Sequence, residues 1–190
     1  MLYDKTPFDH SREHPLNTFS ANATWSDSTV DPIQRYQVCK AMARGYAVAK
    51  KTDEVRLGHA HAFCAAVIRS YWAEICERSR VSMKIKPLER LAPALVIDVQ
   101  SVADGTGRLI AEFPVEDAGY LIGSIYTVML PDAQRSAMGA YYTPPPLVAR
   151  LLDMAESAGF DFSRGTAIDP ACGGGAFLAP MALRMIACAR

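Results

Sequence analysis

The sequence predicts a mainly α-helical protein whose last part is the first helix, strand and helix of an incomplete, Rossmann-like α/β domain. Apolar residues recur at helical spacing over 31–135. Residues 136–190 contain, in order, a helix that begins with proline, a short apolar run, a turn with three glycines and a final helix. Residues 1–30 are polar with little periodicity, so we expect a mobile N-terminal arm there. The 190 residues thus divide into an arm, a helical domain and the start of an α/β domain.

The first half of the helical domain carries two clear helix starts. Asp31 and Pro32 fit an N-cap and a first helical residue, and apolar residues keep helical spacing to about residue 50. Thr52 begins a second, longer helix that reaches about residue 78 along one apolar stripe. His61 lies on this stripe, where we expect a hydrogen-bonded core histidine rather than a metal ligand.

Two further helices are expected in the second half of the domain. The third runs from Pro87 through Val102 and ends at the glycines of 104–107. The fourth runs over 114–130, although Gly119 and Gly123 weaken it.

The C-terminal part begins with a helix that has Thr143 as N-cap, Pro144 as first residue and Gly159 as C-cap glycine. A short strand is expected over 166–168. The last helix starts at about Ala176, and Pro180 should bend it or shorten its first turn.

Composition indicates an ordinary globular protein. Lys plus Arg and Asp plus Glu number 20 each, so net charge gives no support for a nucleic-acid partner, although a local basic stripe could suffice. The five cysteines are scattered without a C-x-x-C pair, which disfavours a disulfide framework and a metal site. No signal peptide and no apolar run of about 18–20 residues is found. We therefore expect a cytoplasmic protein with no membrane partner.

The glycine turn after Asp169 is typical of a cofactor site, because backbone N–H groups and a helix N-terminus face the same point. The dinucleotide fingerprint G-x-G-x-x-G fails, since Leu178 occupies its third glycine position, and no phosphate-binding Gly-Lys-Ser/Thr follows. An acid at the strand end would repel a pyrophosphate but accept hydrogen bonds from ammonium or hydroxyl groups. The pattern alone favours a cationic or hydroxylated ligand, and NAD or ATP stays open as an alternative.

The sequence contains two unusual strings, Gly-Ala-Tyr-Tyr-Thr-Pro-Pro at 139–145 and Asp-Pro-Ala-Cys-Gly-Gly-Gly-Ala-Phe-Leu at 169–178. Together they resemble motifs X and I of N6-adenine-specific DNA methyltransferases of restriction-modification systems. Their order and separation fit that family, and the resemblance covers about residues 130–185. It implies S-adenosyl-L-methionine as cofactor and adenine in DNA as substrate. The residues that it implies for cofactor binding are Tyr142, Thr143, Pro144, Asp169, Pro170, Ala171, Cys172, Gly173, Gly175 and Phe177.

The resemblance also implies roles. Tyr142 and Thr143 would line the cofactor pocket, and Asp169 would pair with the ammonium group of the methionine moiety. Residues 171–173 would offer backbone contacts, and Phe177 would pack beneath the turn. The plainer alternative makes Tyr141 and Tyr142 core aromatics. For Cys172 we favour the role of a small buried filler whose backbone does any binding.

Two features of the family are missing from the sequence. It contains no Asn-Pro-Pro-Tyr string, which in the family holds the target amino group and stacks on a flipped adenine, and no second acid for the cofactor ribose. No catalytic residue is therefore assigned. We expect the N-terminal part of such an enzyme, or a truncated copy, inactive alone and contacting DNA only through the complete enzyme. The alternative is a non-catalytic helical interaction subunit of a restriction-modification complex, with a partner chain completing the sheet.

Overall fold

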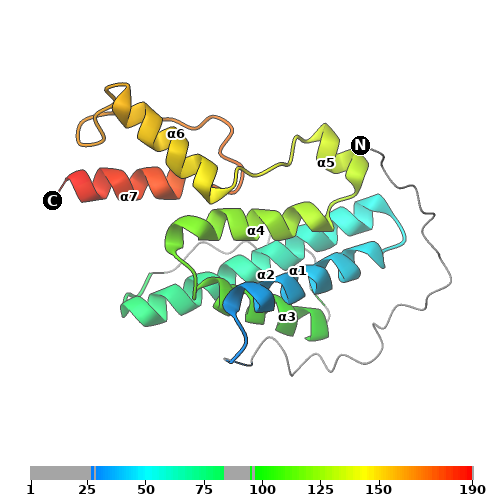
Figure 1. Ribbon diagram of the computed structural model, residues 1–190. Coiled ribbons are helices and arrows are strands. Elements are labelled where there is room, and N and C mark those ends of the chain that lie inside the picture. The colour runs from blue at the N-terminus through cyan, green and yellow to red at the C-terminus, as the bar shows by residue number, and fades with distance from the viewer. Residues whose placement is uncertain (1–26, 28, 84–94, 96, 190) are drawn as a thin grey trace, which may run out of the picture.

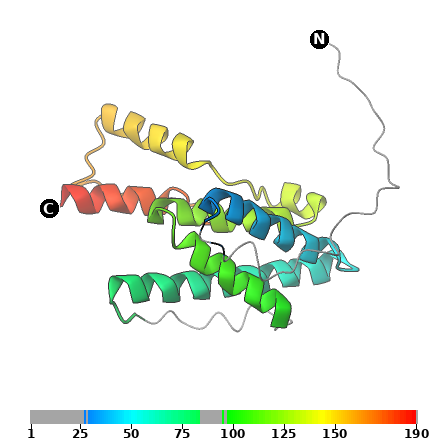
Figure 2. The same ribbon diagram turned by 60° about the horizontal axis from the view of Figure 1, so that its bottom comes forward.

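A computed structural model describes residues 27, 29–83, 95 and 97–189 (Figure 1). Helices α1 (Pro32–Val48), α2 (Asp53–Ser79), α3 (Ile97–Ile110) and α4 (Val115–Met129) form a bundle. Helices α5 (Asp132–Ala137), α6 (Pro145–Ser157) and α7 (Leu178–Cys188) follow, and the described residues contain no strand. Figure 2 shows α6 and α7 outside the bundle, with α7 near α4. The expected mobile arm lies almost wholly outside the described residues.

The first two helices begin where the sequence predicts, and their caps explain why. The Asp31 carboxylate accepts a hydrogen bond from the Ile33 N–H at 3.2 Å, and Pro32 is the first helical residue. The Thr52 hydroxyl accepts one from the Val55 N–H at 3.3 Å. The long helix α2 ends where Arg80 adopts a left-handed conformation, with φ of 53°.

The predicted end of the third helix is wrong. Its predicted start at Pro87 lies outside the described residues, and its predicted end at 104–107 lies inside α3, which continues to Ile110. The reason is a close crossing with α2. A Cβ on Gly107 would lie 2.5 Å from the carbonyl oxygen of Val67, so only glycine lets the two backbones approach this closely.

The core of the bundle is formed by side chains from all four of its helices. Its largest fully buried members are Phe63, Val67, Leu109, Ile110, Ile125, Met129 and Leu130.

Three arginine side chains form hydrogen bonds or an ion pair around this core. Arg56 donates to the carbonyls of Met129 and Leu130, at the end of α4, and Arg78 donates to the carbonyl of Ala111, just after α3. The near-buried Arg35 forms a bidentate ion pair with Glu112 at 3.0 and 3.3 Å.

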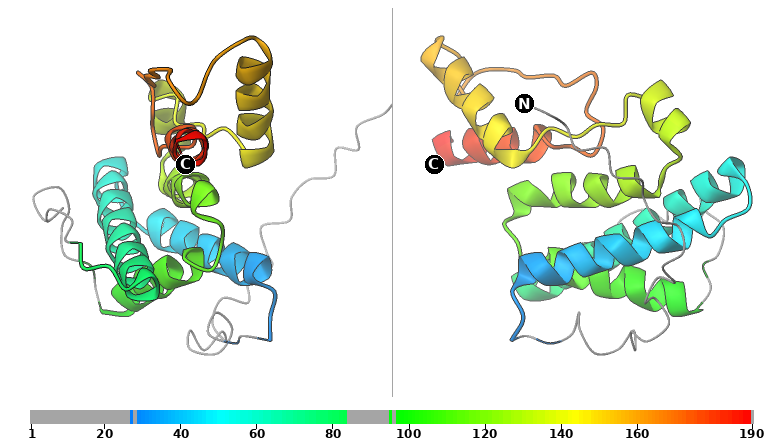
Figure 3. Two further views of the ribbon diagram at one scale, coloured as in Figure 1. Left: turned by 90° about the vertical axis from the view of Figure 1, so that its left-hand side faces the viewer. Right: turned by 45° about the vertical axis from the view of Figure 1, so that its right-hand side comes forward.

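A second, smaller apolar cluster joins α6, α7 and the loop between them, with Val148, Leu152, Phe162 and Ala176 buried. In Figure 3, α7 lies between α6 and the bundle, next to α4. Arg184 on α7 ties the pair together, since it contacts the Asp153 carboxylate and donates to the carbonyl of Ala149.

The ends of α6 and α7 differ slightly from expectation. Pro145, not Pro144, is the first residue of α6, and Thr143 provides no side-chain cap. Gly159 follows α6 with φ of 98°, which confirms it as the glycine that ends the helix. Helix α7 begins at Leu178, two residues later than expected. Pro180 therefore falls in the first turn, where no intrahelical hydrogen bond is lost.

The strand expected over 166–168 is not formed. These residues are irregular, and the Ile168 side chain is 86% exposed. A strand exists only through pairing with a neighbour, and no other strand is present in the part of the chain that the structure describes. The mainly helical class is confirmed, whereas the Rossmann-like sheet stays a prediction. No helix among the described residues combines the length and the apolar character needed to cross a membrane.

Candidate ligand-binding cavity

A cavity of about 660 Å³ lies where the second half of α4, the segment between α5 and α6, and the turn before α7 meet. We call residues 169–177 the glycine turn. The cavity brings together the two strings at 139–145 and 169–178. Its lining residues are Tyr126, Met138, Gly139, Ala140, Tyr141, Tyr142, Thr143, Asp169, Pro170, Ala171, Cys172, Gly173, Ala176 and Phe177.

Eight of the ten cofactor-binding residues named from the sequence line this cavity, and two do not. Pro144 is the N-cap residue of α6, where its carbonyl accepts from the Val148 N–H at 3.1 Å. Gly175 shapes the turn instead. Its φ is 80°, in the region that favours glycine, and its N–H donates to the Cys172 carbonyl at 2.7 Å.

The Tyr142 ring is held between α4 and the glycine turn. A Cβ on Gly123 would lie 2.7 Å from ring atoms of Tyr142, and a Cβ on Gly174 would lie 2.9 Å from the same ring. Burial raises the pKa of the Tyr142 phenol. The ring is therefore a half-buried wall of the cavity with one face against glycine backbone.

The two glycines of α4 also allow the glycine turn to pack against this helix. Gly119 and Gly123 are four residues apart and so lie on one face of the helix. A Cβ on Gly119 would lie 2.5 Å from the carbonyl oxygen of Gly174, so the two backbones are in direct contact. The residues that weaken α4 by propensity are thus the ones that let the glycine turn dock on it.

Asp169 stands at the entrance of the turn, half-buried, and its carboxylate accepts a hydrogen bond from the Ala171 N–H at 3.1 Å. Among the described lining residues it is the one side chain charged at neutral pH. Tyr126, Tyr141, Tyr142 and Phe177 supply aromatic rings around the same space. A carboxylate among aromatic rings suits a ligand with a cationic group, because both attract positive charge.

The expectation for Cys172 and the alternative role for Tyr141 are both wrong. Cys172 is exposed on the cavity wall and so is not a buried filler, because the glycine turn presents it to solvent rather than to the core. Tyr141 is not a core aromatic, since its side chain is 66% exposed. A hydrogen bond with the Ser136 hydroxyl lowers the pKa of the Tyr141 phenol.

One aromatic residue of the cavity wall, Tyr126, was not expected from the sequence, and its partner His61 is not the core histidine that was expected. His61 is exposed rather than core, and its Nε2 lies 3.0 Å from the Tyr126 hydroxyl oxygen. The two rings stack at 5.7 Å with an interplanar angle of 12°. The available signal was spacing, since Tyr126 follows Gly119 and Gly123 on one helical face.

Comparison with protein-family models, with curated protein sequences and with solved structures finds no significant match for this chain.

Proposed function

We propose that the cavity binds S-adenosyl-L-methionine and that the chain is the N-terminal part of an N6-adenine DNA methyltransferase. The observation that carries this proposal is the meeting of both sequence strings around one cavity whose single described carboxylate is Asp169. The ligand carries an ammonium group that Asp169 can pair with and a sulfonium that attracts aromatic faces. A polyphosphate would meet a carboxylate instead of a cation, which disfavours ATP and NAD.

Methyl transfer itself requires groups that the 190 residues do not contain. They include no Asn-Pro-Pro-Tyr string, which in the family that the chain resembles holds the target amino group and stacks on a flipped adenine. We therefore propose that these residues supply the methyl-donor side of a site whose DNA side lies on other residues, in the same chain or another.

Calorimetric titration of the 190-residue chain with S-adenosyl-L-methionine tests the proposal, with ATP and NAD as comparison ligands. We expect saturable binding of the sulfonium cofactor, weaker binding of its demethylated product, which lacks the sulfonium charge, and no displacement of the cofactor by ATP or NAD. Tighter binding of either nucleotide would instead favour a different nucleotide-binding protein. A methyl-transfer assay on DNA completes the test, and we expect no turnover by this chain alone.

A second candidate is the helical interaction subunit, and exposed apolar side chains favour it. Leu147, Leu151 and Met154 repeat at helical spacing along α6 and are exposed, as is Ile168 beside the glycine turn. A partner that covers them would bury this stripe and pair with the irregular segment 166–168.

Light scattering after size exclusion tests this alternative. The alternative would be supported if the chain associates, if Leu151→Glu abolishes the association, and if Arg150→Glu, a change at the neighbouring exposed site, leaves it intact. A stable monomer would count against it.

A further inference from the structure

Lys40 is a half-buried lysine that bridges two helices of the bundle. It lies on α1, and its Nζ donates a hydrogen bond to the Ser124 hydroxyl on α4. None of the ion pairs in the described part of the chain involves Lys40. Burial lowers the pKa of its ammonium group. A partly desolvated cation without an anionic partner is a ready site for an anion.

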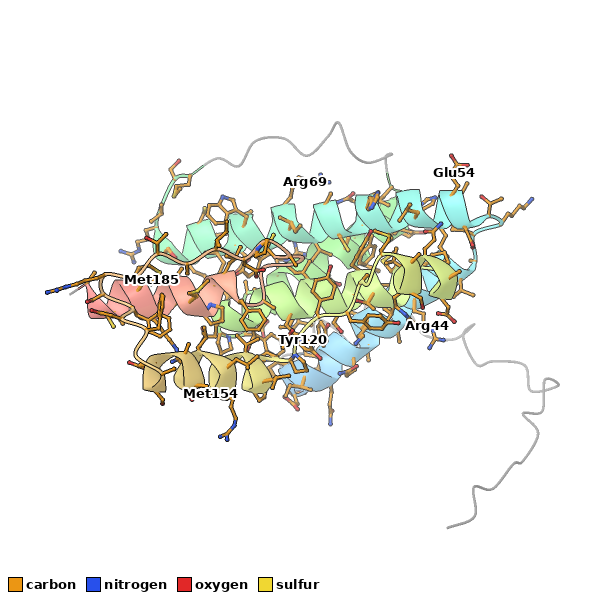
Figure 4. The ribbon with its side chains drawn as sticks, turned by 90° about the horizontal axis from the view of Figure 1, so that it is seen from above. Arg44, Glu54, Arg69, Tyr120, Met154 and Met185 are labelled. Carbon is orange, nitrogen blue, oxygen red and sulfur yellow. The ribbon has the colours of Figure 1, made fainter. Side chains whose placement is uncertain are left out.

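A cavity of about 200 Å³ opens beside this ammonium group. It is lined by Lys40, Tyr120, Ser124, Thr127, Val128, Tyr141 and Tyr142. Lys40 is the one ionised side chain in that described set, and five of the other six carry hydroxyl groups. The Ser124 hydroxyl accepts from Lys40 and also hydrogen-bonds to the Tyr36 hydroxyl, which itself donates to the Leu121 carbonyl. Ser124 therefore holds the ammonium group in place, and the remaining N–H groups of Lys40 can donate to a ligand. Tyr120 is labelled in Figure 4.

An acid, Asp117, shares a different cavity with Lys40. Asp117 and Lys40 both line a separate cavity of about 250 Å³, in which Gln37 and Tyr36 also lie. Burial, with a smaller effect of Glu116, raises the pKa of the Asp117 carboxyl. Asp117 does not line the cavity beside Tyr141, where Lys40 is the one ionised side chain among the described lining residues.

We propose that Lys40 and Tyr120 form a binding site for a phosphate group in the cavity beside Tyr141 and Tyr142, with Ser124 positioning the Lys40 ammonium group. An ammonium point charge with hydroxyl donors around it is a common way to hold phosphate oxygens. The phosphate belongs either to a free phosphate compound or to the phosphodiester backbone of a nucleic acid. Tyr141 and Tyr142 line both this site and the 660 Å³ cavity, so the two ligands would be neighbours.

Backbone amide chemical shifts followed by NMR test the site with two probes, inorganic phosphate and a thymidine dinucleotide, at constant ionic strength. We expect saturable shifts at Lys40, Ser124 and Thr127. In Lys40→Gln the affinity should fall about tenfold, since one charge-assisted hydrogen bond is lost. Lys51→Gln removes the same charge from an exposed position away from the cavity and should leave the affinity unchanged. The probe that binds more tightly identifies the source of the phosphate.

The proposal is overturned if neither probe shifts these amides saturably at millimolar concentration, or if Lys40→Gln and Lys51→Gln behave alike. The Asp169→Asn variant separates this result from the proposed function. It should keep the phosphate response while it loses affinity for the sulfonium cofactor, since Asp169 does not line the phosphate cavity.

Discussion

We expect Asp169 to decide which ligands the main cavity accepts, because it is the charged side chain among the described lining residues. We expect Asp169→Asn to weaken S-adenosyl-L-methionine binding about tenfold, the cost of one charged hydrogen bond. Calorimetry measures the change. Asp161→Asn is the matched control, because Asp161 also accepts from an N–H two residues ahead, that of Ser163, yet lies outside the cavity. Equal affinities of the two variants would remove Asp169 from the site.

The buried thiol of Cys64 makes stability depend on alkaline pH. Burial raises its pKa from 9.0 to about 12. The folded state then keeps a proton that the unfolded state loses above pH 9, so stability falls as pH rises from about 9 towards 12. Between pH 8 and 10 this thiol alone should cost roughly 1 kcal/mol of unfolding free energy.

Urea unfolding of wild type and Cys64→Ala at both pH values checks this effect. The variant should lose less stability between them than wild type does. The burial of Cys39, whose thiol pKa is also raised, acts in the same direction in both proteins and so cancels in the comparison. An identical loss would mean that the Cys64 thiol does not titrate differently on unfolding.

At the scale of single residues, the sequence predicts the cavity wall better than it predicts burial. Two separated strings identified most of the wall because a turn and a helix start impose local geometry that the residue types reveal. The position of Tyr126 in the cavity wall and the exposure of Cys172 depend on how α4 packs against the glycine turn. That contact is tertiary and leaves only a spacing signal in the sequence.

Three glycines inside helices, Gly107, Gly119 and Gly123, mark close contacts in this fold. We expect Gly107→Ala to destabilise the protein by about 1–3 kcal/mol, because its Cβ would collide with the Val67 carbonyl of α2. Gly45→Ala is the control. Nothing lies within 4 Å of a Cβ there, so the change should stabilise α1 by roughly 0.5–1 kcal/mol. Thermal or urea unfolding gives both values, and destabilisation of the same size in both variants would contradict the close crossing of α2 and α3.

Gly123→Ala tests how α4 supports the cavity. A Cβ at this position would meet the Tyr142 ring at 2.7 Å, so the ring must move. We expect lower affinity for the ligand with little loss of bundle stability, because the clash lies at the cavity wall and alanine favours the helix. Calorimetry and urea unfolding separate the two effects. Unchanged affinity would show that the position of Tyr142 does not matter for binding.

At the scale of helices, capping residues predict well where a helix starts, whereas glycines predict poorly where a helix ends. Asp31 and Thr52 act through neighbours two or three residues away, so the sequence contains the whole cause. Gly105 and Gly107 were expected to end a helix, yet both lie inside α3. At Gly107 the close approach of α2 selects glycine. Propensity alone does not distinguish a helix end from a helix crossing.

Across the whole molecule, α4 is the element that connects the bundle to the C-terminal helices. One of its faces contributes Ile125 and Met129 to the core, and Gly119 and Gly123 contact the glycine turn and Tyr142. The sequence predicted the helical bundle because the apolar periodicity is local. The strand that it predicted over 166–168 is not formed, because strand pairing depends on a neighbouring strand that the described residues do not supply.

Protection of Cys172 from alkylation tests the central claim most directly, since this exposed thiol lines the proposed S-adenosyl-L-methionine cavity. Cys188, also exposed but at the end of α7 and outside the cavity, is an internal control in the same molecule. Mass spectrometry after timed iodoacetamide treatment measures both rates. We predict that S-adenosyl-L-methionine slows the reaction of Cys172 and leaves Cys188 unchanged, whereas ATP and NAD protect neither. An unchanged Cys172 rate at high cofactor concentration would contradict the account.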